Sequence, residues 1–179
     1  EERLLFVDES FFEDKRLSFI KGNVTNIDGI KKKIFIEGYG YKTYDKLIIA
    51  TGARPVMPYG DNVGGVCCLR DLEDAIKIKK MAQKAENCIV IGGGLVSLKA
   101  AWALNEIGKK VTVLVESNRV LSRAVDFCCS LMVQNIFKEN GISIILSSKI
   151  KGLSSESGKI KGVMLDDGSL CPCDLVVVG

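Results

Sequence analysis

Three small residues interrupt an apolar stretch in the middle of the chain. After the apolar run Cys88–Ile91, Gly92, Gly94 and Ser97 follow at the spacing G-x-G-x-x-G, with serine in the third position. In a strand–turn–helix unit the first glycine makes the tight turn, and the second lets a pyrophosphate approach the helix N-terminus, where free N–H groups favour an anion. The third position needs a small residue for close helix–strand packing, and serine is nearly small enough. The pattern predicts dinucleotide binding.

An acidic residue follows at the distance that this chemistry requires. Val111–Val115 is predicted to form the next strand, and Glu116 stands at its end, 24 residues after Gly92. A carboxylate about 20 residues beyond the fingerprint accepts hydrogen bonds from the adenosine ribose. The residues expected to bind the nucleotide are Gly92, Gly93, Gly94, Leu95, Val96 and Glu116. The alternative is that the glycines only shape a tight turn in an α/β domain that binds no nucleotide.

Glu116 also bears on which nicotinamide nucleotide binds. Its carboxylate would repel the 2′-phosphate of NADPH. Arg119 and Arg123 follow closely, and either could neutralise such a phosphate. Because an arginine used for phosphate usually comes with loss of the acid, the sequence favours NADH over NADPH.

Histidine is absent from all 179 residues, whereas cysteine occurs seven times. The absence excludes Ser-His-Asp and Cys-His catalysis and His-ligated zinc. No two cysteines form a CxxC pair, and Cys171-Pro172-Cys173 is the one cluster that could carry metal or redox chemistry. We therefore predict no catalytic side chain and no metal site. Thiols that stay unpaired indicate a reducing compartment, which we take to be the cytoplasm.

The composition indicates a globular protein. Hydrophobic residues make up 47% of the chain and charged residues 26%, and no run approaches the roughly 18 apolar residues of a membrane helix. A net charge of +3 is too mild to predict nucleic acid or a membrane as partner. The chain opens with Glu1-Glu2-Arg3, without an initiator Met or a signal peptide, so we expect further residues before Glu1.

The elements that carry these residues change in kind along the chain. A short helix through Lys15 is expected first. Short strands with the turn pattern of an antiparallel meander follow at Leu17–Ile20, Val24–Ile27, Ile34–Ile36 and Tyr41–Tyr44. The apolar run Lys46–Ala50 predicts a strand buried on both faces. Residues 53–65, rich in proline and glycine, form a linker, so we place one domain at 1–60 and a second at 61–179.

In the second part, helices alternate with strands. Helices are predicted from Asp71 to about Lys84, over Leu95–Ile107 and over about Ala124–Glu139, and strands over Cys88–Ile91, Val111–Val115 and Ile142–Leu146. This order predicts an α/β fold with a Rossmann-like parallel sheet. Short strands at Ile150–Ser154, Ile160–Leu165 and Ser169–Leu170 predict an antiparallel β-meander crossover. Leu175–Val178 reads as a last buried parallel strand, which needs cover on both faces, so we expect the protein to continue beyond Gly179.

Three stretches carry a family resemblance. They are TYDKLIIATGARP at 43–55, CLRDLEDAIKIKKMAQKAENCIVIGGGL at 68–95 and DDGSLCPCDLVVVG at 166–179. Together they resemble the pyridine nucleotide-disulfide oxidoreductase superfamily, in the branch of NADH oxidases, nitrite-reductase-type flavoproteins and rubredoxin or ferredoxin reductases. No glycine fingerprint precedes residue 43, so the resemblance implies an internal fragment: a partial FAD-binding domain followed by the NAD(P)-binding domain.

The resemblance implies an enzyme that passes a hydride from NADH to FAD and then electrons to an acceptor. Oxygen, peroxide, nitrite, a disulfide and a small redox protein such as rubredoxin all stay open as acceptors, and a homodimer is conceivable for the longer protein. The residues that the resemblance assigns to cofactor contacts, besides the glycine turn, are Ala50, Thr51, Gly52, Arg54 and Gly179. The family's redox cysteines lie outside this region.

The chain departs from the family pattern at three positions. Ser97 replaces the third glycine, and Lys99 stands where the family has an acid that faces nicotinamide and flavin. Val115 occupies the position of the family's usual ribose-binding acid, one residue before Glu116. The alternative to an enzyme is a module that senses NAD(H) without turnover, although a pure sensor has no reason to carry Thr51–Pro55.

Overall fold

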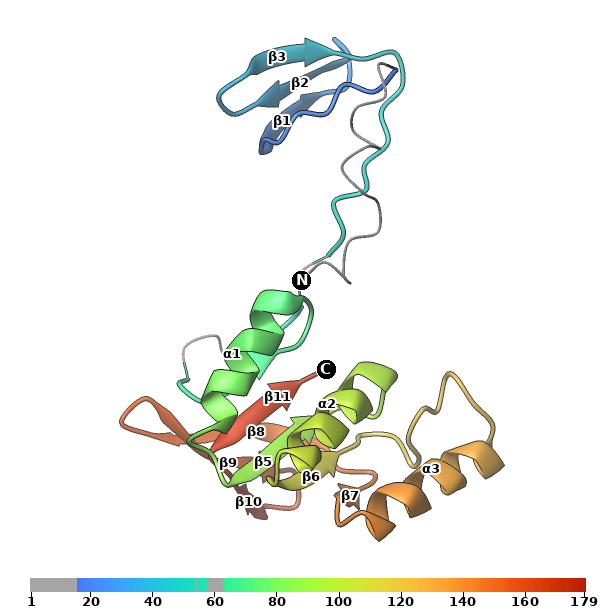
Figure 1. Ribbon diagram of the computed structural model, residues 1–179, viewed down its shortest axis with the longest axis vertical. Helices are drawn as coiled ribbons and strands as arrows, with labels where there is room; N and C mark the ends of the chain where they lie inside the picture. The colour runs from blue at the N-terminus through green and yellow to red at the C-terminus, as the bar shows by residue number, and fades with distance from the viewer. Residues whose placement is uncertain (1–15, 54, 58–62) are drawn as a thin grey trace. The chain divides into compact units, whose positions relative to one another are not determined.

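The chain forms two units in the computed structural model, which describes residues 16–53, 55–57 and 63–179 (Figure 1). Residues up to Gly52 belong to the first unit and residues from Ala53 onward to the second. The division therefore falls where the proline- and glycine-rich linker begins. The helix predicted through Lys15 lies outside the described residues.

The first unit contains an antiparallel sheet in the order β1-β2-β3. Its strands are β1 (Val24–Asp28), β2 (Lys33–Ile36) and β3 (Gly40–Thr43). The first turn is closed by Asp28, whose carboxylate accepts hydrogen bonds from the N–H groups of Ile30 and Lys31 at 3.1 and 2.9 Å. Across β2 and β3, the rings of Phe35 and Tyr41 lie 5.0 Å apart. Three of the four strands predicted for the antiparallel meander are confirmed.

Two other strands predicted for this unit are wrong. Neither Leu17–Ile20 nor Lys46–Ala50 forms a strand, and Ile48 and Ile49 are 89% and 64% exposed. A strand needs a neighbour for its backbone N–H and C=O groups. No strand of the described residues pairs with either segment. An apolar run alone therefore does not produce a buried strand here.

The second unit is built on a parallel sheet in the order β4-β11-β5-β6-β7. The strands are β4 (Val66–Cys68), β5 (Asn87–Ile91), β6 (Lys110–Leu114), β7 (Ser143–Ile145) and β11 (Leu175–Val178). All neighbouring pairs run parallel. The predicted Rossmann-like sheet is confirmed, whereas β4 was not predicted from the sequence.

Three helices connect the parallel strands. They are α1 (Leu72–Ala82), α2 (Leu95–Glu106) and α3 (Phe127–Glu139). Asp71 caps α1 by accepting a hydrogen bond from the N–H of Asp74 at 3.0 Å. Asp126 caps α3 in the same way, from the N–H of Cys129 at 2.8 Å. This cap explains why α3 begins three residues later than predicted.

An antiparallel sheet in the order β10-β9-β8 is inserted between β7 and β11. Its strands are β8 (Ile150–Glu156), β9 (Lys159–Leu165) and β10 (Leu170–Pro172). This insertion is the β-meander crossover predicted from the sequence.

The parallel sheet is buried on both faces, with successive side chains of one strand entering different clusters. Cys88 and Val90 of β5 pack in a cluster with residues of all three helices, such as Ala101. Ile89 of β5 packs instead with residues of β9, including Val163. The unit therefore has three layers, helices, parallel sheet and antiparallel sheet (Figure 1). This burial explains the continuous apolar runs that identified the strands.

Candidate functional site

A tight glycine turn joins β5 to α2. Gly92 has φ of +121°, a left-handed backbone that favours glycine, and its N–H donates to the carbonyl of Leu114 at 2.9 Å. Gly94 is the N-cap of α2, and its carbonyl accepts the first helical hydrogen bond from Leu98 at 3.0 Å. The N–H groups of the first turn have no acceptor within the helix and can bind an anion.

The three glycines of this turn differ in the space that surrounds them. A Cβ on Gly92 would lie 2.6 Å from Ser97 Oγ, and a Cβ on Gly93 would lie 2.6 Å from Val115 Cγ1. Packing therefore excludes side chains at both positions. A Cβ on Gly94 would meet nothing within 4 Å. Gly94 thus lies beside open space at the N-terminus of α2, and a side chain at this position would extend into that space.

The open space belongs to a pocket of about 510 Å³. Its lining residues are Gly92, Gly93, Gly94, Leu95, Val115, Glu116, Ser117, Leu121, Ser122, Arg123 and Ala124. Five residues predicted from the sequence, the three glycines with Leu95 and Glu116, thus meet in one cavity. β6 ends at Leu114, one residue before the predicted end, and Glu116 lies exposed in the pocket two residues after the strand. Its carboxylate is therefore available to hydroxyl groups of a ligand.

A second pocket, of about 300 Å³, lies against the other side of the α2 N-terminus. Val96 and Gly179, both predicted cofactor contacts, line this pocket rather than the first one. Its remaining lining residues are Ala53, Pro55, Val56, Leu69, Arg70 and Val178. Because Leu95 and Val96 are adjacent in the first turn of α2, an extended ligand crossing this turn reaches both pockets.

Ser97 lies buried between Gly92, which follows β5, and Gly179, which follows β11. It is 1% exposed, and its Oγ has no hydrogen-bond partner among the described residues. Cβ atoms built on Gly92 and Gly179 would lie 2.6 and 2.5 Å from this oxygen. Ser97 therefore fills the space between the ends of β5 and β11, the close-packing role predicted for the third fingerprint position. Its hydroxyl adds an unpaired polar atom to that contact.

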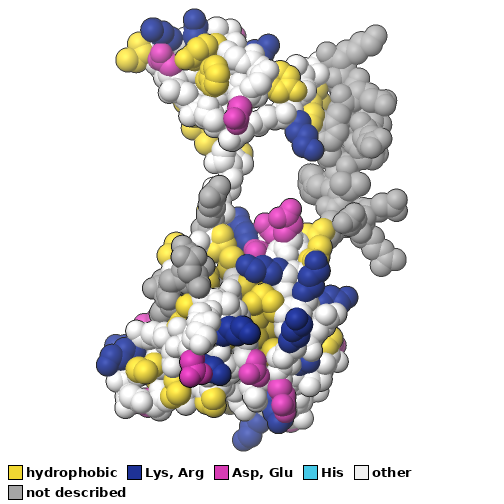
Figure 2. Space-filling view, turned by 90° about the vertical axis from the view of Figure 1, so that its left-hand side faces the viewer, with side chains coloured by type: hydrophobic (Ala, Val, Ile, Leu, Met, Phe, Trp, Pro, Cys, Tyr) yellow, Lys and Arg dark blue, Asp and Glu magenta, His cyan; other side chains and the backbone are white. Residues whose placement is uncertain are grey.

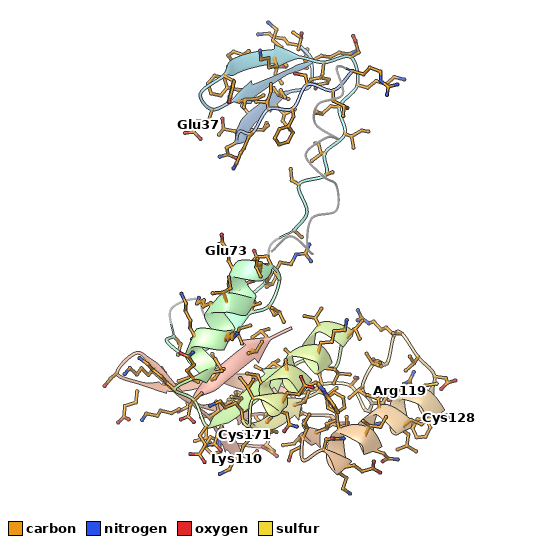
Figure 3. All side chains as sticks on the ribbon, viewed as in Figure 1. Glu37, Glu73, Lys110, Arg119, Cys128 and Cys171 are labelled. Atoms are coloured by element: carbon orange, nitrogen blue, oxygen red, sulfur yellow. The ribbon has the colours of Figure 1, made fainter. Side chains whose placement is uncertain are left out.

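Arg119 and Arg123 both lie in the loop between β6 and α3. The sequence alone could not decide which of them would face a ligand phosphate. Arg123 lines the larger pocket. Arg119, labelled in Figure 3 on the loop before α3, does not. Its guanidinium donates a hydrogen bond to the carbonyl of Ser122 at 3.0 Å. The hydroxyl of Ser117 in turn donates to the carbonyl of Arg119 at 2.7 Å. Arg123 is thus the cation that a nucleotide phosphate would meet.

Four pocket residues of this loop were missed from the sequence. They are Ser117, Leu121, Ser122 and Ala124. The loop has no hydrophobic periodicity. Leu121 adopts a φ of +50°, a left-handed backbone conformation that is uncommon for leucine and could not be predicted from the sequence. Val115 also lines the pocket; the sequence placed it at the position of the family's ribose-binding acid but did not count it among the expected cofactor contacts.

The cysteines include one cluster that could carry metal or redox chemistry. All seven are free, and the described residues contain no group of acids and cysteines that could hold a metal ion. Burial raises the pKa of Cys67 and of Cys88 from 9.0 to about 11, and that of Cys173 to about 12. These thiols stay protonated and unreactive near neutral pH.

Three of the residues assigned to FAD lie in the first unit. Ala50, Thr51 and Gly52 are exposed and belong to no helix or strand. Arg54, the fourth, lies outside the described residues.

Among the described residues, no helix is both long enough and apolar enough to cross a membrane.

Comparison with known proteins assigns the family. The sequence profile of the pyridine nucleotide-disulphide oxidoreductases matches residues 9–179. The chain belongs to the pyridine nucleotide-disulphide oxidoreductase family. The resemblance found in the three sequence stretches is therefore confirmed.

Individual relatives cover the chain almost completely. It is 30% identical over 174 residues to a rubredoxin-NAD(+) reductase of Pseudomonas putida, which covers 96% of this chain and 45% of the relative. It is 30% identical over 181 residues to rhodocoxin reductase of Rhodococcus erythropolis, which covers 99% of this chain and 42% of the relative. The crystal structure of a ferredoxin reductase from Rhodopseudomonas palustris matches with a TM-score of 0.89 at 29% identity, over 99% of this chain and 45% of that one. The chain spans less than half the length of these relatives.

Proposed function

We propose that the second unit binds NADH across the N-terminus of α2. The diphosphate lies against Gly94, the adenosine half occupies the pocket that contains Glu116, and the nicotinamide half enters the pocket of Val96 and Gly179. The observation that carries this proposal is the open space at Gly94 between two pockets, where a Cβ would meet no atom within 4 Å. The dipole of α2 and its free N–H groups stabilise the negative charge.

NADH is preferred to NADPH in this proposal. Glu116 accepts hydrogen bonds from the ribose 2′- and 3′-hydroxyls and repels a 2′-phosphate. Arg123 shares the pocket and attracts phosphate, so the preference depends on which of these two side chains approaches the ribose more closely. No arginine replaces the acid, which supports NADH.

The whole protein is proposed to be an FAD-dependent oxidoreductase. The first unit belongs to a domain that holds FAD, in which Ala50, Thr51, Gly52 and Arg54 contact the cofactor. When bound, FAD accepts the hydride that NADH gives up. The side chains of the second unit then orient the nucleotide and exclude water, because the hydride chemistry belongs to the two cofactors.

We infer a small redox protein as the electron acceptor. Rubredoxin-NAD(+) reductase and rhodocoxin reductase are similar to this chain, and another matching structure, at 26% identity, is a covalent complex of putidaredoxin reductase with putidaredoxin.

The seven free thiols support a cytoplasmic location.

The experiment has two arms. In the first, the 179-residue chain is titrated with NADH, and saturable binding is expected. In the second, the whole protein is purified with its flavin and mixed with NADH and an oxidised carrier protein. Rapid bleaching of the flavin followed by reduction of the carrier supports the enzyme. NADH binding without flavin reduction would instead support a sensor of NAD(H).

A further inference from the structure

The pocket assigned to the nicotinamide carries a positive charge in an apolar lining. Of the eight described residues that line its volume of about 300 Å³, Arg70 is charged and the others are apolar residues or glycine. No carboxylate of the described residues is part of this lining. Apolar side chains accept a ring of any charge, whereas a cation distinguishes a neutral ring from a positive one.

Lys99 places a second cation on the same side of α2 as this pocket. It lies three residues after Val96, which lines the pocket, and residues three apart share one face of a helix. Side chains of a helix lean toward its N-terminus, so the exposed Lys99 extends toward the end of α2 that borders the pocket. Neither Lys99 nor Arg70 forms an ion pair with any residue that the structure describes.

The acids that follow Arg70 are engaged with other groups. Asp71 accepts a hydrogen bond from the N–H of Asp74 at 3.0 Å. Asp74 accepts hydrogen bonds from the backbone N–H of Arg70 at 2.9 Å and from the thiol of Cys68 at 3.7 Å. Neither acid lines the pocket. The N-terminus of α2 adds the positive end of a helix dipole, and the first turn of this helix contains no acid that would offset it.

The charge at this pocket is local. Figure 2 shows Lys and Arg side chains interspersed with Asp and Glu side chains on the second unit. Exposed charges more than a Debye length away, about 10 Å at 0.1 M salt, are largely screened. The charge that a bound nicotinamide ring meets therefore depends on the groups at the pocket, which are Arg70, Lys99 and the N-terminus of α2.

We propose that Arg70 and Lys99 make this pocket select NADH over its oxidised form, NAD⁺. The inference rests on the proposed function, since it requires the nicotinamide to occupy this pocket. The two nucleotides share the adenosine, both riboses and the diphosphate. They differ in the ring, which is neutral in NADH and a positively charged pyridinium in NAD⁺, so the two cations repel the oxidised form alone. The same repulsion favours release of NAD⁺ once the hydride has passed to FAD.

The test is calorimetric titration of the 179-residue chain with NADH and, separately, with NAD⁺. The readout is the ratio of the two dissociation constants, because any effect on the shared diphosphate or riboses cancels in it. Lys99→Gln removes one charge, Lys99→Glu reverses it, and Arg70→Gln removes the charge that lines the pocket. The control, Lys138→Glu, makes the same reversal on the exposed surface of α3.

We expect the wild type to bind NADH about tenfold more tightly than NAD⁺, and this ratio to fall as salt screens the cations. The ratio should fall about threefold in Lys99→Gln and in Arg70→Gln, which is the effect of one unit charge about 6 Å from the ring in water. Reversal of the charge in Lys99→Glu should lower the ratio about tenfold, because repulsion becomes attraction. The control should keep the wild-type ratio.

Two results would overturn the selection of the reduced nucleotide. One is a ratio that stays constant through the Lys99 and Arg70 variants, and the other is a ratio that changes equally in Lys138→Glu. In both cases, NADH binding by the wild type would leave the proposed nucleotide site standing. If neither nucleotide binds the wild type, the proposed function itself fails.

Discussion

The backbone N–H of Leu121 donates a hydrogen bond to the carbonyl oxygen of Gly93 at 2.7 Å. This bond ties the loop after β6 directly to the glycine turn. Ser117 anchors the same loop from its other end, because its carbonyl accepts a hydrogen bond from the N–H of Ser147 at 3.0 Å. The wall of the larger pocket that carries Glu116 and Arg123 is thus held in place by backbone contacts, which reduces the ordering cost of binding a nucleotide.

Replacement of Glu116 tests nucleotide selectivity. The wild-type chain is expected to bind NADH at least tenfold more tightly than NADPH. In Glu116→Ala that ratio should approach one, because the repulsion of the 2′-phosphate and the ribose hydrogen bonds are both lost. Dissociation constants for both nucleotides provide the measurement, with Glu139→Ala on α3 as the control. A ratio unchanged by Glu116→Ala would mean that this carboxylate does not face the ribose.

Removal of the Arg123 side chain should weaken the binding of both nucleotides. Arg123 lines the pocket and attracts any phosphate there, so Arg123→Ala should lower the affinity for NADH about three- to tenfold. The salt dependence of binding should also become less steep, since one cation fewer is screened. Titrations at two salt concentrations test this, and an affinity that does not change would place the phosphates away from the loop.

Two buried serines should respond to alanine in opposite ways. Ser97 Oγ has no partner among the described residues, whereas Ser130 Oγ donates to the carbonyl of Val120 at 2.8 Å. Ser97→Ala removes an unpaired buried hydroxyl and should leave the free energy of unfolding unchanged or raise it by about 1 kcal/mol. Ser130→Ala breaks a buried hydrogen bond and should lower it by about 1 to 2 kcal/mol. Urea unfolding measures both, and a clear loss in Ser97→Ala would indicate an acceptor for its hydroxyl.

Alkaline pH should reduce the stability of the folded chain through its buried thiols. Burial raises the pKa of Cys88 from 9.0 to about 11 in the folded state. Below pH 9 the thiol is protonated in both states and its contribution is fully present; as pH rises from 9 to 11, only the unfolded chain releases the proton, and stability is lost.

The substitution Cys88→Ala isolates this contribution. The alanine variant should be less stable than wild type at pH 8, and the difference should shrink by about 2 kcal/mol by pH 10.5. Urea unfolding at the two pH values makes the comparison. A difference that stays constant would show that the Cys88 thiol ionises alike in the folded and unfolded chain.

The 179-residue chain should bind NADH but hold no FAD. Its only glycine fingerprint lies in the second unit, and Thr51 and Gly52 are exposed outside any helix or strand. The purified chain mixed with FAD and then desalted should therefore show no flavin absorbance near about 450 nm. Stoichiometric retained flavin would contradict this assignment of the first unit.

The second unit could be predicted largely because local and tertiary signals agree in it. The strands β5, β6 and β11 are continuous apolar runs because both faces of the sheet are covered. The N-cap residue is Asp in α1 and α3 and glycine in α2, and both residue types are typical of helix starts. In contrast, β4 has only the three residues Val66–Cys68, too few for any pattern.

The first unit and the pocket loop could not be predicted to the same extent. Lys46–Ala50 has the composition of a buried strand but no partner among the described residues, and pairing is not encoded in the segment itself. In the loop, the distinction between Arg119 and Arg123 depends on a hydrogen bond from Arg119 to Ser122. Contacts of this kind follow from the folded backbone and leave no periodic signal in the sequence.

The most direct test of the nucleotide site is calorimetric titration of Gly94→Val with NADH. Gly94 has open space around its missing Cβ and an ordinary φ of −85°, so valine should leave the fold intact while occupying the volume of the diphosphate. Gly152→Val on β8, which also has open space around it, is the matched control. We expect at least a hundredfold loss of NADH affinity in Gly94→Val, unchanged affinity in the control, and wild-type circular dichroism in both. Wild-type affinity in Gly94→Val would contradict the account, because the phosphates would then have to lie elsewhere.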